Sequence, residues 1–256
     1  MPIFKRNTFG QLIFVKKMII RLFGTIVYGR FNWVHTPKIT GAEQFQYLPD
    51  ENVLIVSNHQ TYFADVSFFF HVIHAAISGR PNRINYPGYL SCKKHNIYYV
   101  AAEETMKSGF LPKLLALSGA VTVNRTWRAN GENVRRAVDR SETENIDKAL
   151  NDGWVITFPQ GTTKPFSPGR KGTAILIKKH QPIVVPVVID GFRRAFDKKG
   201  LKNKKKSSEL RMAVKPALDI DYSKTVEEIM AQVMEAIEQT PDFDYIEKIK
   251  KQPVVE

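Results

Sequence analysis

The chain has 256 residues, of which 43% are hydrophobic and 25% are charged, and its formal net charge is +13. This composition is typical of a globular protein with one sizeable core, and the single cysteine excludes an internal disulfide framework and fits a reducing compartment. The positive charge favours an anionic partner such as nucleic acid, a phospholipid surface, an acidic carrier protein or a phosphorylated substrate. The sequence contains no zinc-finger spacing, RNP motif or basic leucine zipper, so nucleic-acid binding rests on charge alone.

Residues 11–34 predict an amphipathic helix near the N-terminus. Its apolar arc contains Leu12, Val15, Met18, Ile19, Leu22 and Ile26, and a basic stripe beside it contains Lys17 and Arg21. The charges interrupt the segment before the roughly 20 apolar residues that a membrane span needs. Basic and aromatic residues on such a helix are typical of attachment at a membrane interface, and the alternative is a helix that packs on the core. We expect residues 1–38 to be an attachment segment and residues 39–256 to be the main domain.

The next element carries the first candidate for chemistry. Residues 53–56 form a short β-branched apolar run bounded by polar residues, which predicts a buried strand. His59 follows this strand, and Asp65 lies six residues later. A histidine at a strand end can act as a general base when a carboxylate fixes its tautomer. The alternative is that both residues belong to a turn and a helix cap without any chemistry.

The remaining pattern alternates helices with strands. Residues 66–78 predict a buried helix, in which His71 and His74 lie three residues apart but have no nearby carboxylate or thiolate that would indicate a metal site. Residues 79–97 form a turn-rich excursion. Further strands are expected at residues 98–102, 119–124, 154–158, 184–189 and 210–214, with helices at residues 111–117 and from Thr225 onward. This alternation predicts an α/β fold with a mixed, largely parallel sheet flanked by helices. The lysines of residues 198–206 indicate a solvated loop or a contact to an anionic surface.

Three later stretches place polar groups at strand ends. Gly119-Ala-Val-Thr-Val-Asn-Arg125 ends a strand on an arginine, and Phe158-Pro-Gln-Gly-Thr-Thr163 runs into a turn whose backbone N–H groups can meet an anion. The third stretch is a buried strand that carries Pro186. In a largely parallel sheet these strand ends would gather at one rim, together with His59.

In chain order, these blocks resemble the motifs of the glycerolipid acyltransferase family, whose best-known bacterial members acylate 1-acylglycerol-3-phosphate. That family carries Asn-His-x4-Asp, Gly-x5-Arg, Phe-Pro-Glu-Gly-Thr-Arg and a strand with Val-Pro. The resemblance covers residues 39–192, the greater part of the main domain that we expect at residues 39–256.

The resemblance implies a reaction and a set of site residues. His59 would take the proton of an acceptor hydroxyl, with Asp65 orienting its ring, and the hydroxyl would attack the thioester of acyl-CoA or acyl-carrier protein without a covalent acyl-enzyme. The expected substrate-binding residues are Arg125, which would hold the phosphate of the acceptor, and Gln160, Gly161, Thr162, Thr163 and Lys164. The implied partners are a lysolipid, the acyl donor as co-substrate and the cytoplasmic face of a membrane, with a peripheral or monotopic attachment. No metal, other cofactor or nucleic acid is implied.

Three departures from the family pattern affect these expectations. Five residues separate His59 from Asp65, one more than in the family, so contact requires a bulge or an earlier helix start. Gln160 replaces a glutamate and Thr163 replaces an arginine. The candidates for a replacement cation are Lys164, Arg170 and Lys171. The departures favour an acceptor other than lysophosphatidic acid, such as another lysolipid or an amino-acid lipid, and they leave a non-catalytic membrane-binding homologue as the competing class.

Overall fold

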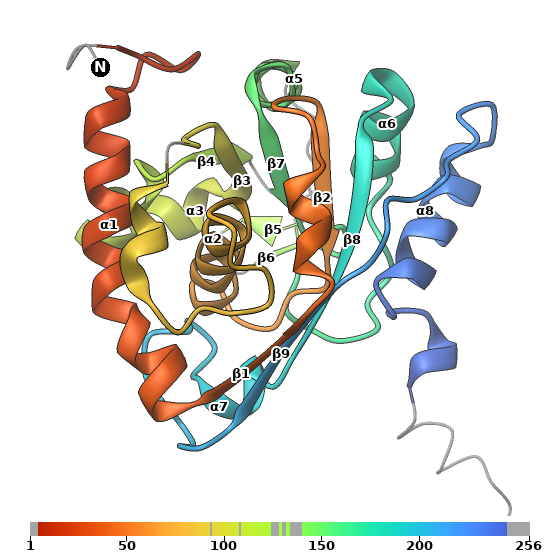
Figure 1. Cartoon of the computed structure of the whole chain (residues 1–256). Coiled ribbons are helices and arrows are strands. Elements are labelled where there is room, and N and C mark those ends of the chain that lie inside the picture. The colour runs from red at the N-terminus through yellow and green to blue at the C-terminus, as the bar shows by residue number, and fades with distance from the viewer. Residues whose placement is uncertain are drawn as a thin grey trace, which may run out of the picture.

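The computed structural model describes residues 5–92, 94–107, 109–123, 128–129, 132–133 and 140–244. A seven-stranded sheet lies at the centre of the molecule, with the strand order β1-β9-β8-β2-β7-β3-β4 (Figure 1). The strands are β1 (Thr36–Thr40), β2 (Val53–Ser57), β3 (Ile97–Ala102), β4 (Ala120–Val123), β7 (Trp154–Thr157), β8 (Ile183–Asp190) and β9 (Glu209–Val214). A separate short hairpin pairs β5 (Arg128–Ala129) with β6 (Glu132–Asn133).

The sheet is mixed and largely parallel, which confirms the predicted fold class. Strands β8, β2, β7, β3 and β4 run in one direction, whereas β9 is antiparallel to β8 and β1 is parallel to β9. All five residues of β2 are buried, because β8 and β7 flank this strand and helices cover both of its faces. A continuous apolar run, without alternation of polar residues, is the pattern of a strand in such a position.

Helices cover both faces of the sheet. They are α1 (Ile13–Gly29), α2 (Ala64–Ile77), α3 (Glu103–Lys107), α4 (Phe110–Ala116), α5 (Arg140–Asp152), α6 (Lys171–His180), α7 (Phe192–Ala195) and α8 (Val226–Ala236). Helices α1 and α2 lie on one face of the sheet, and α6 and α8 lie on the other (Figure 1). Side chains of α1 and α2 share one core with the sheet, and those of α5, α6 and α8 share the core on the opposite face. Successive residues of β2 point into the two cores in turn, as the strand geometry requires.

Helix α1 is apolar on two sides. Ile19 and Ile20 are buried against the core, which agrees with the core-packing alternative for this part of the helix. The other part of the expected arc is on the surface, since Met18 is 53% and Leu22 is 56% exposed. In the described part of the chain, no helix has the length and apolar character needed to cross a membrane. The expected boundary after residue 38 falls inside β1, so the sheet includes residues from both sides of it.

A buried lysine fixes α1 to the end of the sheet. Lys16 is 1% exposed, its Nζ donates a hydrogen bond of 2.9 Å to the carbonyl of Ile97, and it lies 4.1 Å from the centre of the Tyr98 ring. Gly119 allows this approach, because a Cβ there would lie 2.9 Å from Nζ, and its φ of +128° is one that other residues rarely adopt. Burial lowers the pKa of Lys16 to about 7, although the nearby Asp152 acts in the opposite direction.

The buried lysine predicts a pH dependence of stability. Between its folded pKa of about 7 and its unfolded pKa of about 10.4, the unfolded chain binds more protons at Lys16, so the free energy of unfolding should rise with pH. The contribution is at most about 1.4 kcal/mol per pH unit. Urea unfolding between pH 7 and pH 9.5 should show this rise for the wild type and for the exposed control Lys148→Met, but not for Lys16→Met. An equal slope in wild type and Lys16→Met would contradict the assignment.

Candidate active site

Residues from the ends of three strands gather at one rim of the sheet, and His59 and the turn after residue 158 are among those that the sequence singled out. His59 follows β2, the turn from Phe158 to Gly161 follows β7, and Asp190 ends β8. Because β8, β2 and β7 are parallel neighbours, their carboxyl ends lie side by side. This rim of an open α/β sheet is where ligands bind in such folds.

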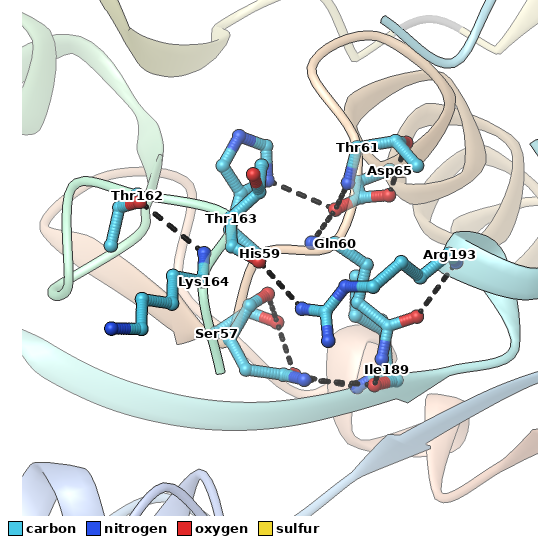
Figure 2. A network of polar contacts seen from close by, with 11 residues as sticks. Ser57, His59, Gln60, Thr61, Asp65, Thr162, Thr163, Lys164, Ile189 and Arg193 are labelled. Carbon is cyan, nitrogen blue, oxygen red and sulfur yellow. Dashed lines mark hydrogen bonds and ion pairs between the residues drawn. The ribbon is translucent and has the colours of Figure 1, made fainter. Parts of the chain in front are cut away.

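His59 and Asp65 are in contact despite the additional residue between them. The Nδ1 atom of His59 lies 2.9 Å from Oδ2 of Asp65, which is completely buried in the first turn of α2 (Figure 2). The same Oδ2 accepts hydrogen bonds from the backbone N–H groups of Gln60 at 2.6 Å and Thr61 at 2.9 Å. The Thr61 hydroxyl donates to the other carboxylate oxygen at 2.6 Å. The loop therefore curls around the carboxylate, and this curl accommodates the extra residue.

The His59 ring has a defined orientation. It stacks on Phe158 with the ring centres 4.0 Å apart and the planes 19° apart, and 14% of the side chain remains exposed. Since a carboxylate accepts hydrogen bonds, its contact with Nδ1 selects the tautomer in which Nδ1 carries the proton. Nε2 is then the nitrogen that can accept a proton from a bound molecule.

Side-chain amides fasten the His59 loop to β8. Asn58 donates to the carbonyl of Ile189 and accepts from its N–H, both at 2.8 Å. Gln60 donates to the same carbonyl at 3.1 Å and accepts from the backbone N–H of Arg193 at 3.1 Å. Gln60, Thr61 and Arg193 are site residues that the sequence interpretation did not name. The only signal in the sequence was that an amide residue, Gln60, and a hydroxyl residue, Thr61, lie between His59 and Asp65.

The residues of the turn after β7 contact different parts of the chain. Gln160 is buried and donates to the carbonyl of Ser167 at 2.9 Å and to Oε1 of Gln239 at 3.2 Å, so its amide group joins this turn to the chain after α8. Gly161 has a φ of +62° and closes the turn through a hydrogen bond to the carbonyl of Phe158.

Thr162, Thr163 and Lys164 continue this turn beside the His59 loop (Figure 2). The Thr162 hydroxyl accepts from the backbone N–H of Lys164 at 3.2 Å, and the carbonyl of Thr163 accepts from the guanidinium of Arg193 at 2.6 Å. Arg125, which was expected to bind phosphate, lies outside the described residues. Lys171, one of the expected replacement cations, forms an ion pair of 2.5 Å with Glu227 at the start of α8.

Two adjacent apolar cavities lie beside the His59 loop. The first is bounded by His59, Phe158 and residues of β3, and the second lies between α1 and α2 and reaches Ile20 and Val27. Tyr62, Val66 and Tyr99 line both of them, so these side chains form the boundary between the two cavities. The first cavity therefore offers an apolar space next to His59, and the second offers a further apolar space beyond these three side chains.

Comparisons with known proteins agree with this geometry. A family model described as Acyltransferase matches residues 37–190, which include the His59 loop and the turn after β7. The crystal structure of the 1-acyl-sn-glycerophosphate (LPA) acyltransferase PlsC from Thermotoga maritima superimposes with a TM-score of 0.51 at 20% sequence identity, covering 92% of this chain and 80% of that chain. At this identity the likeness concerns the fold. None of the curated protein sequences matches the chain.

Proposed function

Because the chain belongs to the acyltransferase family and is therefore an acyltransferase, we propose that it transfers a fatty acyl group to the hydroxyl of a lysolipid such as 1-acylglycerol-3-phosphate. The donor would be the thioester of acyl-CoA or acyl-carrier protein. The observation that carries this proposal is the 2.9 Å contact between His59 and Asp65 at the entrance of an apolar cavity. It supplies a proton acceptor with a fixed tautomer next to a place for an acyl chain.

In the proposed reaction, Nε2 of His59 takes the proton of the acceptor hydroxyl while the hydroxyl oxygen attacks the thioester carbonyl. The tetrahedral intermediate then collapses, the carbon–sulfur bond breaks, and the departing thiolate takes the proton from the imidazolium. Asp65 holds the ring and stabilises its charged form. General-base assistance of this kind contributes on the order of 10²–10⁴ in rate, and the positioning of the two substrates supplies much of the rest.

The apolar cavities suit the acyl chain of the donor. Tyr62, Val66 and Tyr99 line both of them, so a chain whose carbonyl lies at His59 would pass these residues on its way between α1 and α2. Burial of the chain would contribute about 0.8 kcal/mol for each methylene group. The binding free energy of the donor therefore becomes more favourable with each added methylene group until the cavity is filled.

Helix α1 supports a location at the surface of a membrane. Its exposed side carries Phe14, Met18, Leu22 and Ile26, each more than half exposed, and Trp33 beyond the helix is 82% exposed. Spacings of four residues place the four helical side chains on one stripe. Aromatic and aliphatic side chains on a basic helix favour attachment at the level of the lipid head groups. We propose peripheral attachment at the cytoplasmic face through this stripe.

Removal of the His59 imidazole tests the reaction. His59→Ala should lower the rate of acyl transfer by about 10²–10⁴, because it removes the imidazole that is proposed to accept the proton of the acceptor hydroxyl. His180→Ala is a matched control, since His180 also contacts a carboxylate, that of Asp147 at 2.6 Å, but lies at the end of α6. The assay should use purified proteins whose circular dichroism spectra agree. Full activity of folded His59→Ala would leave a non-catalytic role for this scaffold as the better explanation.

A larger side chain at the junction of the cavities tests the path of the acyl chain. Val66→Trp should shift the preference from a palmitoyl to a butyryl donor, because Val66 lines both cavities and an indole in its place would fill space at the boundary between them. The measurement is the ratio of kcat/KM for the two donors. Val66→Ala is the control and should keep the preference of the wild type. An unchanged ratio in Val66→Trp would place the chain elsewhere.

A charge on the exposed stripe tests membrane attachment. Leu22→Glu should weaken sedimentation with anionic phospholipid vesicles by about tenfold, because a carboxylate cannot enter the interface without a desolvation cost. Ile175→Glu on α6 is the matched control, since Ile175 is 51% exposed and Leu22 is 56% exposed. Equal vesicle binding of the two variants would exclude α1 as the attachment element.

A further inference from the structure

A basic pocket lies next to the His59 loop, toward β8, whereas the apolar cavities lie toward β3. Its wall includes the side chains of Gln60 and Thr163. Four cationic residues line it, namely Lys164, Arg193, Lys198 and Lys204. Arg193, Lys198 and Lys204 come from the segment after β8 and lie beyond the residues that the family model matches.

In the part of the chain that the structure describes, none of these four cations forms an ion pair within 4.0 Å of an Asp or Glu oxygen, although Asp65 and Asp190 act on the Arg193 guanidinium from a longer distance. Asp197 also lines the pocket, but its Oδ1 accepts from the backbone N–H groups of Leu201 and Lys202 at 2.7 and 2.8 Å. It therefore shapes the loop. Like charges gathered in one pocket create a local positive potential that attracts an anion.

The loop that carries the lysines is fixed against the His59 motif. The carbonyls of Lys198 and Lys199 accept from the backbone N–H groups of Tyr62 at 3.1 Å and Phe63 at 2.9 Å. Gly200, with a φ of +77°, lies so close to the start of α2 that a Cβ there would be 2.5 Å from the nitrogen of Ala64. The pocket is thus held in a constant position relative to the loop that presents His59.

Arg193 connects the pocket to the turn after β7. Its guanidinium donates to the carbonyl of Thr163 at 2.6 Å (Figure 2). Its own carbonyl accepts from Nζ of Lys204 at 3.2 Å. Thr163 occupies the position at which the family motif carries an arginine. A cation from α7, Arg193, therefore lies beside this position. The sequence had suggested Lys164, Arg170 or Lys171 as the replacement cation.

We propose that the basic pocket binds a phosphate group of one of the two substrates, with Arg193, Lys198 and Lys204 as its ligands. The proposal rests on the proposed acyl transfer, which brings phosphate-bearing molecules to His59. Phosphate oxygens match the planar fork of a guanidinium and the point charge of an ammonium group. Two sources share this chemistry: the phosphate of the acceptor and the nucleotide phosphates of acyl-CoA.

Direct binding of inorganic phosphate, measured by calorimetry at fixed ionic strength, tests the pocket without any assay of activity. Arg193→Gln should weaken binding by about tenfold, the effect of losing one charge-assisted contact, and the double variant Lys198→Ala/Lys204→Ala, which loses two, should weaken it by at least as much. Lys148→Ala/Lys224→Ala removes the same charge from exposed sites on the opposite face of the sheet and should bind phosphate as the wild type does. Equal weakening in this control, or unchanged binding in the pocket variants, would overturn the proposal.

Steady-state kinetics with matched substrates identifies the source of the phosphate. If it belongs to the donor, the pocket variants should raise KM about tenfold for acyl-CoA but not for acyl-pantetheine, which lacks the nucleotide. If it belongs to the acceptor, KM should rise for 1-acylglycerol-3-phosphate but not for 1-acylglycerol.

An unchanged KM for all four substrates, together with weaker vesicle binding, would assign the lysines to the membrane surface and overturn the proposal. A wild type that binds phosphate at the pocket but transfers no acyl group would contradict the proposed function and leave the anion site in place.

Discussion

The site depends on one buried carboxylate. Asp65 accepts hydrogen bonds from two backbone N–H groups, a threonine hydroxyl and the His59 ring, and all four donors come from the residues directly before its helix. Such a carboxylate determines the path of the loop as well as the orientation of the imidazole. Replacement of the carboxylate would therefore leave several buried donors unsatisfied, each at a cost of about 1–3 kcal/mol. The same carboxylate therefore holds the loop in place and orients the imidazole.

The His59 loop separates two environments with opposite properties. Toward β3 the neighbouring space is apolar and continues between α1 and α2, and toward β8 it is lined by cations. The two proposed kinds of substrate group match these environments: the fatty chain of a thioester suits the apolar side, and a phosphate group suits the cationic side. The order of the sheet produces this division, because β2 lies between β7 and β8. The position of β2 in the sheet therefore places His59 between the apolar cavities and the proposed anion site.

The sequence predicted most strands of the central sheet but not every element around it. The strands at residues 53–56, 154–158 and 184–189 were confirmed as β2, β7 and β8, because continuous β-branched runs are typical of buried parallel strands. Helix α6 was not predicted, since four of its ten residues are cationic or histidine and its apolar stretch is short. The roles of Arg193 and Lys204 could not be predicted, because they depend on which strands are neighbours and on a loop more than 130 positions after His59.

The pairing of β1 determines the order in which the protein can fold during synthesis. Within the described sheet, β1 is bonded to β9 alone, and Thr36 aligns with Glu209. On the ribosome, the N-terminal strand must therefore wait until almost the whole chain has emerged before it finds its partner. Helix α1, which precedes β1, carries apolar side chains that remain exposed even in the folded protein. The growing chain accordingly presents these side chains before its sheet is complete, so the attachment proposed for α1 would not need to wait for the fold.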